Sequence, residues 1–271
     1  MAITKTLLQS DAMEGTDLNL SVSRRTFLRS LQQKKYRRQH RRFLIEGIKP
    51  VTEAITSSYP LESLYIAEDL AAEYLEFQVL LRGRGVQPTL IKRIEIDRIG
   101  TLRAPEGVIA VAELPAPVSF SLTGTDTPAI YLWEINDPGN LGSVLRTALW
   151  FGVKRVILSP GSADVYGPKV VRGSMGALFR LSIMEAVEFE LLVDEIRKQG
   201  LALLAADGSG TDRNPGKTGP SWVLVFGSET HGVPRNILES ADRVVGIEKR
   251  GYGESLNLGV SVGIILNRLM I

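Results

Sequence analysis

Residues 129–159 read AIYLWEINDPGNLGSVLRTALWFGVKRVILS, and this segment indicates the architecture of the longer part of the chain. Two apolar runs, 129–135 and 154–159, flank a stretch, 141–152, whose apolar residues recur at helical spacing. A strand, a helix and a second strand in this order are typical of a parallel sheet, and strands that are apolar throughout indicate a sheet covered on both faces. The segment therefore predicts a parallel α/β domain.

The same alternation continues to the end of the chain. Short apolar runs predict further strands, and segments with helical spacing predict the helices between them. The expected strands are 181–185, 201–206, 222–227 and 243–247, and the expected helices lie around 169–178, at 188–200, from about 234 onward and at 258–271. We therefore expect one α/β domain over residues 129–271.

A smaller α/β unit is expected upstream. Residues 42–113 alternate between strand and helix patterns over a length typical of a small domain. Residues 114–128, LPAPVSFSLTGTDTP, hold three prolines and several Ser and Thr without periodicity, so we interpret them as a linker. The expected elements of the upstream unit are strands at 43–47, 61–67 and 106–114 and helices at 49–58 and 69–83.

Composition excludes several classes of function. The chain has 271 residues, of which 44% are hydrophobic, enough to bury a sizeable core. It contains no cysteine and two histidines, which excludes a disulfide framework, thiolate chemistry and a His-rich metal site, so we expect no metal. No run approaches the ~18 apolar residues of a membrane span, and the first residues lack the features of a secretory signal, so we expect a cytoplasmic protein without membrane contact.

Positive charge is concentrated near the N-terminus. Residues 24–42, RRTFLRSLQQKKYRRQHRR, include no acidic residue, although the formal net charge of the chain is +2. Such a run repels itself unless it meets a polyanion, so it indicates nucleic acid contact, with Phe27 and Tyr36 available for stacking; a solvated helix face is the alternative. We expect residues 1–41 to form a flexible basic extension. The candidate RNA-binding residues are Arg24, Arg25, Lys34, Lys35, Arg37, Arg38, Arg41 and Arg42.

The turn after the first strand of the longer domain is rich in glycine. Residues 136–146, NDPGNLGSVLR, place Asn140 in a tight turn and Arg146 on the helix that follows. Ligands of open α/β sheets bind beyond the carboxyl ends of the strands, where exposed N–H groups can meet an anion. The motifs GxxxxGK[ST] and GxGxxG do not occur in the sequence, so a nucleoside triphosphate or NAD site is not supported.

Two later turns carry polar side chains in the same setting. In 225–233, VFGSETHGV, Glu229 lies between two glycines and is either a ligand contact or an ordinary turn or helix-start residue. In 248–257, Ser255 and Asn257 precede the closing helix, so each is either a helix cap or part of a site. If the strands are neighbours, the three turns converge and form one candidate site.

Together the three turns resemble the signature motifs of the SpoU-type RNA ribose 2′-O-methyltransferases in the SPOUT superfamily of knotted methyltransferases. DPGNLGSVLRTA (137–148), FGSE (226–229) and SLNLGVSVG (255–263) are similar to the three motifs and occur in the same order. Residues 42–113, with FLIEG and APEGVIAVAE, also resemble the small ribosomal-protein-like substrate-binding domain of this family. The resemblance covers nearly all of the chain after Arg42.

The resemblance implies a deep trefoil knot in the longer domain, a homodimer through that domain, and S-adenosylmethionine as the methyl donor, held largely by backbone groups. The residues at the positions of the donor site are Gly227, Ile247, Leu256, Ala205 and Asp207.

Catalytic roles follow from the same resemblance. Arg146 would orient the ribose and stabilise negative charge that develops on its oxygen. Ser255 and Asn257 would hold the motif geometry and the nucleotide, while Asn140 and Glu229 would brace the turns.

The expected function is S-adenosylmethionine-dependent 2′-O-methylation of a ribose in structured RNA, with ribosomal RNA as the first candidate substrate. A transfer RNA ribose methyltransferase, a base methyltransferase of the same fold and a non-catalytic RNA-binding module are the alternatives. The retained Arg146, Glu229 and Ser255-Leu256-Asn257 disfavour the last of these, because a protein that only binds RNA has no need of them.

Overall fold

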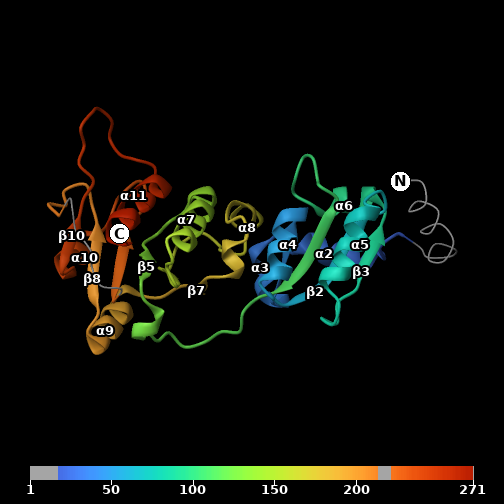
Figure 1. Ribbon diagram of the computed structural model, residues 1–271, viewed down its shortest axis with the longest axis horizontal. Helices are drawn as coiled ribbons and strands as arrows, with labels where there is room; N and C mark the ends of the chain where they lie inside the picture. The colour runs from blue at the N-terminus through green and yellow to red at the C-terminus, as the bar shows by residue number, and fades with distance from the viewer. Residues whose placement is uncertain (1–17, 213–220, 271) are drawn as a thin grey trace. The chain divides into compact units, whose positions relative to one another are not determined.

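The structure, a computed structural model, describes residues 18–212 and 221–270 of the chain (Figure 1). The chain divides into two compact units between Leu114 and Pro115, and we treat the two as separate bodies. In the described part, no helix is both long enough and apolar enough to cross a lipid bilayer.

The first unit is a four-stranded mixed sheet with helices packed against it (Figure 1). The strand order is β1-β4-β2-β3; β4 runs antiparallel to β1 and β2, and β2 pairs with β3 in parallel. Strand β3 and helix α6 were not predicted, because β3 is short and starts at a proline, a weak strand signal. The elements are α2 (Val22–Ser30), α3 (Lys34–His40), β1 (Arg42–Glu46), α4 (Ile48–Thr56), β2 (Leu61–Ala67), α5 (Ala71–Leu80), β3 (Pro88–Ile91), α6 (Arg93–Ile99) and β4 (Val108–Glu113).

The basic run folds as part of this unit, so the prediction of a flexible extension over residues 1–41 is wrong for residues 22–40. Helices α2 and α3 occupy that segment. Leu28 and Leu31 have no exposed surface, and they belong to the same core cluster as Leu44 and Tyr65. Burying a leucine side chain contributes roughly 1.5–3 kcal/mol. The run is therefore ordered because its apolar residues complete the core.

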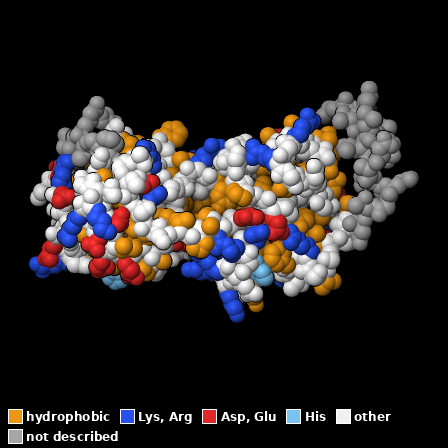
Figure 2. Space-filling view, turned by 90° about the horizontal axis from the view of Figure 1, so that it is seen from below, with side chains coloured by type: hydrophobic (Ala, Val, Ile, Leu, Met, Phe, Trp, Pro, Cys, Tyr) orange, Lys and Arg blue, Asp and Glu red, His pale blue; other side chains and the backbone are white. Residues whose placement is uncertain are grey.

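Carboxylates from elsewhere in the unit neutralise several arginines of the run. Arg24 donates to Glu62 Oε1 at 2.8 Å, and Arg42 donates to Glu62 Oε2 at 2.6 Å. Partial burial alone would raise the pKa of Glu62, but hydrogen bonds from these two arginines hold that pKa below its ordinary value. Arg25 pairs at 2.5 Å with Glu95, which is 1% exposed. Figure 2 shows acidic side chains directly among basic ones on the visible face of this unit.

Two further arginines of the run brace the main chain. Arg37 is 4% exposed and donates to the carbonyl oxygens of Leu31 and Gln32 at 2.8 and 2.6 Å. Arg41 donates to the carbonyl of Leu114 at 2.9 Å, across 73 positions of sequence. A partner 73 positions away cannot be predicted from the sequence of the basic run alone. The side chains with such internal partners are Arg24, Arg25, Arg37, Arg41 and Arg42.

The second unit confirms the predicted parallel α/β fold. Among its described residues, six strands all pair in parallel, in the order β10-β8-β9-β5-β6-β7 (Figure 1). The central strands β5 and β9 are buried at every residue, as expected for a sheet covered on both faces. The knot stays a prediction. The elements are η1 (Gly124–Asp126), β5 (Ala129–Leu132), α7 (Pro138–Trp150), β6 (Arg155–Leu158), α8 (Pro168–Gly173), η2 (Ala177–Phe179), β7 (Ser182–Met184), α9 (Phe189–Gln199), β8 (Ala202–Ala206), β9 (Trp222–Phe226), α10 (Arg235–Ser240), β10 (Arg243–Val245) and α11 (Leu258–Met270).

Helices α7 and α11 lie side by side and run in the same direction. A Cβ atom placed on Gly259, at the start of α11, would lie 2.7 Å from Ser143 Oγ, in the second turn of α7. One turn further along each helix, a Cβ on Gly263 would lie 3.7 Å from Thr147 Cγ2. The absence of a side chain at Gly259 allows this close approach. The packing brings the turn before α11 next to the turn before α7.

Candidate functional site

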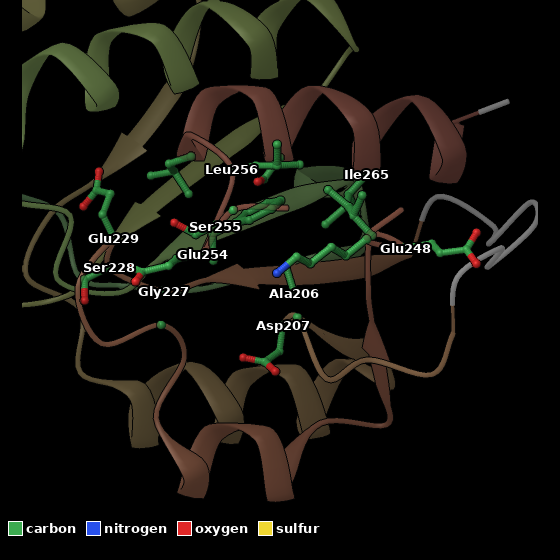
Figure 3. Close-up of a pocket in the computed structure, with 18 of the residues that line it drawn as sticks. Ala206, Asp207, Gly227, Ser228, Glu229, Glu248, Glu254, Ser255, Leu256 and Ile265 are labelled. Atoms are coloured by element: carbon green, nitrogen blue, oxygen red, sulfur yellow. The ribbon is translucent and has the colours of Figure 1, made fainter. Parts of the chain in front are cut away.

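A cavity of about 710 Å³ opens at the carboxyl ends of the central strands (Figure 3). Its wall is formed by the ends of β8 and β9, by the loop 247–256 that follows β10, and by one face of α11. Volumes of 300–1,000 Å³ are typical of small-molecule sites. The position agrees with the rule that open parallel sheets bind ligands beyond the carboxyl ends of their strands.

Four of the five residues predicted to bind the donor line this cavity. They are Ile247 and three residues that Figure 3 labels, Asp207, Gly227 and Leu256. Ala205 does not, because its side chain is fully buried in the core of the unit. Successive side chains of a strand point to opposite faces, and the next residue, Ala206, forms the wall instead.

A chain of hydrogen bonds joins the three turns. Asn140 Nδ2 donates to Glu229 Oε1 at 2.6 Å, and Asn257 Nδ2 donates to Asn140 Oδ1 at 2.9 Å. The main-chain N–H of Gly259 then donates to Asn257 Oδ1 at 2.9 Å. Asn257 therefore caps α11, as one of its two interpretations predicted, and it also contacts Asn140 in the first turn of α7.

The two ends fix the direction of this hydrogen-bond chain. An ionised carboxylate can only accept, and a main-chain N–H can only donate. Each asparagine between them has one acceptor oxygen and one donor amide, so a single orientation of both amides satisfies every member. Glu229 and Ser255 line the cavity. Asn140 and Asn257 are not among its lining residues, and their hydrogen bonds connect the three turns.

The turn before α7 is held from its other side by Asp137. The Asp137 carboxylate accepts from the main-chain N–H of Asn140 at 2.7 Å and so caps α7, while Lys169 Nζ lies 3.6 Å from it. The hydrogen bond from Asn140, and then the charge of Lys169, lower the pKa of Asp137. The cap is therefore ionised at neutral pH and stabilises the positive end of the helix dipole.

Glycine is required where the second turn closes. A Cβ atom on Gly227 would lie 2.0 Å from the carbonyl carbon of Gly232, a separation that no side chain can accept. The Gly232 N–H donates to the Ser228 carbonyl at 2.9 Å, and Gly232 itself has φ +67°. The main chain around Glu229 is thus folded into a compact loop whose polar groups border the cavity.

Arg146 lies on an exposed face of α7 and outside the residues that line the cavity. In the described part of the chain it makes no hydrogen bond or ion pair, so its guanidinium is available to bind an anion. Trp150 follows four residues later on the same face of the helix, with 84% of its surface exposed. The structure therefore does not bring Arg146 to the cavity of its own chain.

Sequence reasoning missed the contribution of the closing helix. Leu258, Ser261 and Ile265 line the cavity from one face of α11. Their spacing of three and four residues is the helical periodicity that marks a shared face, so this signal was present in the sequence. The apolar members suit the flat face of a purine, while Asp207 and Glu229 place carboxylates at the same wall. Within the described ranges, no group of His, Asp and Glu residues could hold a metal ion.

Models of two known families match this chain. The model of the SpoU rRNA Methylase family matches residues 128–267, and the MRM3-like substrate binding domain matches residues 26–110. The 23S rRNA (guanosine(2553)-2′-O)-methyltransferase RlmP of Bacillus subtilis is 26% identical over 89% of this chain and 93% of its own.

Solved structures of similar proteins show the same fold. A putative RNA methyltransferase of the TrmH family from Porphyromonas gingivalis is 30% identical, with a TM-score of 0.78 over 92% of this chain and 98% of that one. The SpoU methyltransferase AviRb from Streptomyces viridochromogenes, solved with its cofactor AdoMet, is 25% identical, with a TM-score of 0.79 over 92% and 97% of the two chains.

Proposed function

The chain belongs to the SpoU rRNA methylase family, and from this premise we propose that it transfers the methyl group of S-adenosylmethionine to the 2′-hydroxyl of a ribose in ribosomal RNA. The observation that carries the proposal is the hydrogen-bond chain from Glu229 through Asn140 and Asn257 to Gly259, which joins the three motif turns beside a cavity of ligand size. The B. subtilis relative, which carries the name of a 23S rRNA 2′-O-methyltransferase, matches nearly the whole chain and supports the substrate class.

The cavity fits the donor by its chemistry. S-adenosylmethionine supplies a methyl group already activated on a positively charged sulfur. Leu258 and Ile265 would cover the adenine and exclude water, and the main chain at Gly227, Ile247 and Leu256 would offer hydrogen bonds. The carboxylates of Asp207 and Glu229 complement the positive charges of the donor.

As the ribose oxygen bonds to the methyl carbon, the carbon–sulfur bond of the donor would break and the hydroxyl proton would pass to water, so negative charge would develop on the oxygen. A guanidinium keeps its own proton in proteins, so Arg146 acts as an orienting and charge-stabilising group rather than as a base. Ser255, at the cavity wall, and Asn257, which is held by Asn140, position the nucleotide beside the donor. Most of the rate enhancement would then come from alignment.

We also infer that two copies of the chain pair through the exposed face of α7 and α11. Trp150 is 84% exposed, and Leu256 and Val260 beside the start of α11 are 51% and 50% exposed. Exposed apolar side chains on and next to two adjacent helices are typical of a protein interface. Arg146 lies on the same face of α7 as Trp150. A second copy of the chain that covers Trp150 would therefore also contact Arg146. Light scattering of the purified protein and of Trp150→Glu tests this pairing; a monomeric wild-type protein would contradict it.

Within the basic run, we infer that the cations left for RNA are those whose side chains make no ion pair and no hydrogen bond. In the described part of the chain, Arg29, Lys34 and Lys35 make no ion pair with a carboxylate. Each phosphate contact to single-stranded RNA contributes about 0.7 to the slope of log affinity against log salt concentration. The double variant Lys34→Ala, Lys35→Ala should therefore lower that slope by at most ~1.4, whereas Lys198→Ala, which breaks a pair with Glu195, should not change it. Equal slopes for all three proteins would exclude the two lysines from RNA contact.

The reaction is tested with labelled S-adenosylmethionine and ribosomal RNA from a strain that lacks the gene. We expect label in the RNA without added divalent ions. A 2′-O-methyl group blocks cleavage at its own phosphodiester, so alkaline hydrolysis should leave the label in dinucleotides. Label in mononucleotides would mean base methylation, and label accepted only by transfer RNA would overturn the ribosomal substrate.

A further inference from the structure

The loop between β10 and α11 carries an aromatic side chain that the function above does not use. Tyr252 is the most exposed large apolar residue of the described chain, at 107% of its reference surface. It lies between Gly251 and Gly253, and a Cβ atom on either glycine would meet nothing within 4 Å. Gly253 has φ +127°, a conformation that other residues rarely adopt. The ring therefore stands clear of the protein at the tip of the loop.

The ring contributes little to the stability of the fold. In the described part of the chain, Tyr252 makes no hydrogen bond and no ring contact. An aromatic side chain stabilises a protein when its surface is buried, and here that surface remains in water. A single exposed aromatic residue is ordinary on a protein surface. The position of Tyr252 is unusual, because this residue lies at the rim of the donor cavity.

The loop ties Tyr252 closely to the motif residues. Ser255 follows three positions later, and an extended chain spans at most ~3.6 Å per residue, so the two Cα atoms are within about 11 Å. Asn257, two positions beyond Ser255, is anchored to Asn140 at 2.9 Å. A nucleotide whose ribose lies beside Ser255 would thus place its own base, or the adjacent base, within reach of the ring.

Two cations accompany the ring on the same loop. Lys249 and Arg250 both line the cavity. Arg250 pairs with Glu248 at 3.1 Å, but both side chains are largely exposed, and such pairs contribute little energy. An exposed aromatic face next to basic side chains is the combination that binds single-stranded nucleic acid, by stacking on a base while the cations meet the phosphates.

We propose that Tyr252 stacks on a base of the RNA substrate, either the target nucleotide or its neighbour, and so holds the ribose at the donor. The inference rests on the proposed function and adds a substrate-binding residue to it. The adenine of the donor is a poorer partner for this ring, because Leu258 and Ile265 already provide an apolar wall inside the cavity while Tyr252 is fully exposed. The interaction needs the face of the ring and not its hydroxyl.

The test measures methyl transfer to ribosomal RNA from the deletion strain, together with donor affinity by calorimetry. Base stacking on an aromatic side chain is worth enough that Tyr252→Ala should raise the KM for RNA by roughly 5- to 100-fold. Tyr252→Phe and Tyr252→Trp should keep the wild-type KM, whereas Tyr252→Leu, which is apolar but has no π face, should behave as alanine does. Donor affinity should be the same in all variants. Leu191→Ala, a partly exposed change on α9 and away from the cavity, is the control.

Three results would overturn the inference while leaving the methyltransferase function intact. They are an unchanged KM in Tyr252→Ala, full rescue by leucine, and a loss of donor affinity in Tyr252→Ala, since the last would place the ring on the donor. If the unaltered protein transfers no methyl group to this RNA, the proposed function itself fails, and the two failures are distinguished.

Discussion

Replacing Asn140 by alanine removes the middle member of the hydrogen-bond chain. Two bonds are lost, the 2.6 Å bond to the Glu229 carboxylate and the 2.9 Å bond from the Asn257 amide. A hydrogen bond to a charged group contributes ~1.5–3 kcal/mol, and one between neutral groups ~0.5–1.5 kcal/mol. Because Glu229 and Asn257 are exposed and Asn140 is partly exposed, the lower ends apply, and the loss is about 2 kcal/mol.

This loss should appear as weaker donor binding. If the donor binds only when the three turns are joined, about 2 kcal/mol corresponds to a dissociation constant raised roughly 30-fold. Calorimetric titration with S-adenosylmethionine measures it, and a thermal melt checks that the unit remains folded. Asn236→Ala, on the exposed face of α10, is the matched control because its side chain makes no hydrogen bond to a described residue.

Two more variants sharpen the result. Asn257→Ala leaves the Asn140–Glu229 bond in place and should cost less than Asn140→Ala. Asn140→Asp places a carboxylate against Glu229 and should cost more, because like charges at this separation repel. If Asn140→Ala binds the donor with wild-type affinity, the hydrogen-bond chain does not organise the cavity and our account of the site is wrong.

Arg146→Ala should lower kcat by about 10²-fold with little change in donor affinity, as expected on losing one transition-state donor, and Arg146→Lys should restore only part of it. If the homodimer forms and Arg146 acts on the partner's cavity, mixing Arg146→Ala with Asn140→Ala protein should recover up to roughly one quarter of wild-type activity, and no recovery would mean that it acts on its own chain. Gly227→Ala should abolish donor binding, because the added methyl would lie 2.0 Å from the main chain, whereas Gly124→Ala, which meets nothing within 4 Å, should not; normal binding by the first variant would contradict the close turn. Asp137→Ala removes a helix cap and should lower stability by about 1 kcal/mol at pH 7. Because the folded-state pKa of Asp137 lies below its unfolded value, this stabilisation is complete above pH ~4 and is lost as the pH falls through the folded value, so melting curves of the two proteins should converge in acid.

The architecture of the second unit could be read from the sequence because its strands are apolar throughout. Strand β9, WVLVF, is apolar at every position and buried at all five, so its type could be read directly, whereas its place in the sheet is known only from the structure. Strand β3 could not be read, since it has four residues and gains its identity only by pairing with β2. Short strands depend on their neighbours more than on their own composition.

The basic run was misread for a different reason. Its charges were judged against their neighbours in sequence, but the partners of Arg25 and Arg42 are carboxylates 70 and 20 positions away. Long-range ion pairs leave no local signal. A truncation up to residue 38 would remove Leu28 and Leu31 from the core and should destabilise the first unit, so it could not serve as a test of RNA binding.

At the site, the sequence supplied the residues but not their arrangement. The motifs led to Asn140, Glu229 and Asn257, yet only the fold reveals that these three share one line of hydrogen bonds. Ala205 was predicted to contact the donor, but the next residue, Ala206, lines the cavity instead. Successive side chains of a strand point to opposite faces, and the sequence does not show which of the two faces borders the cavity.

The hydrogen bond between Asn257 and Asn140 joins residues that are 117 positions apart in the chain. This separation determines when, during synthesis of the protein, the donor site can form. During synthesis on the ribosome, the turn before α7 leaves the exit tunnel long before α11 does. Until α11 has emerged and docked beside α7, Asn140 has no partner from the third turn, and one side of the donor cavity does not exist. We therefore expect a nascent chain to be unable to bind the methyl donor, so that an unfinished protein cannot modify the RNA around it. Donor binding by chains stalled before residue 257 would show that the cavity forms earlier.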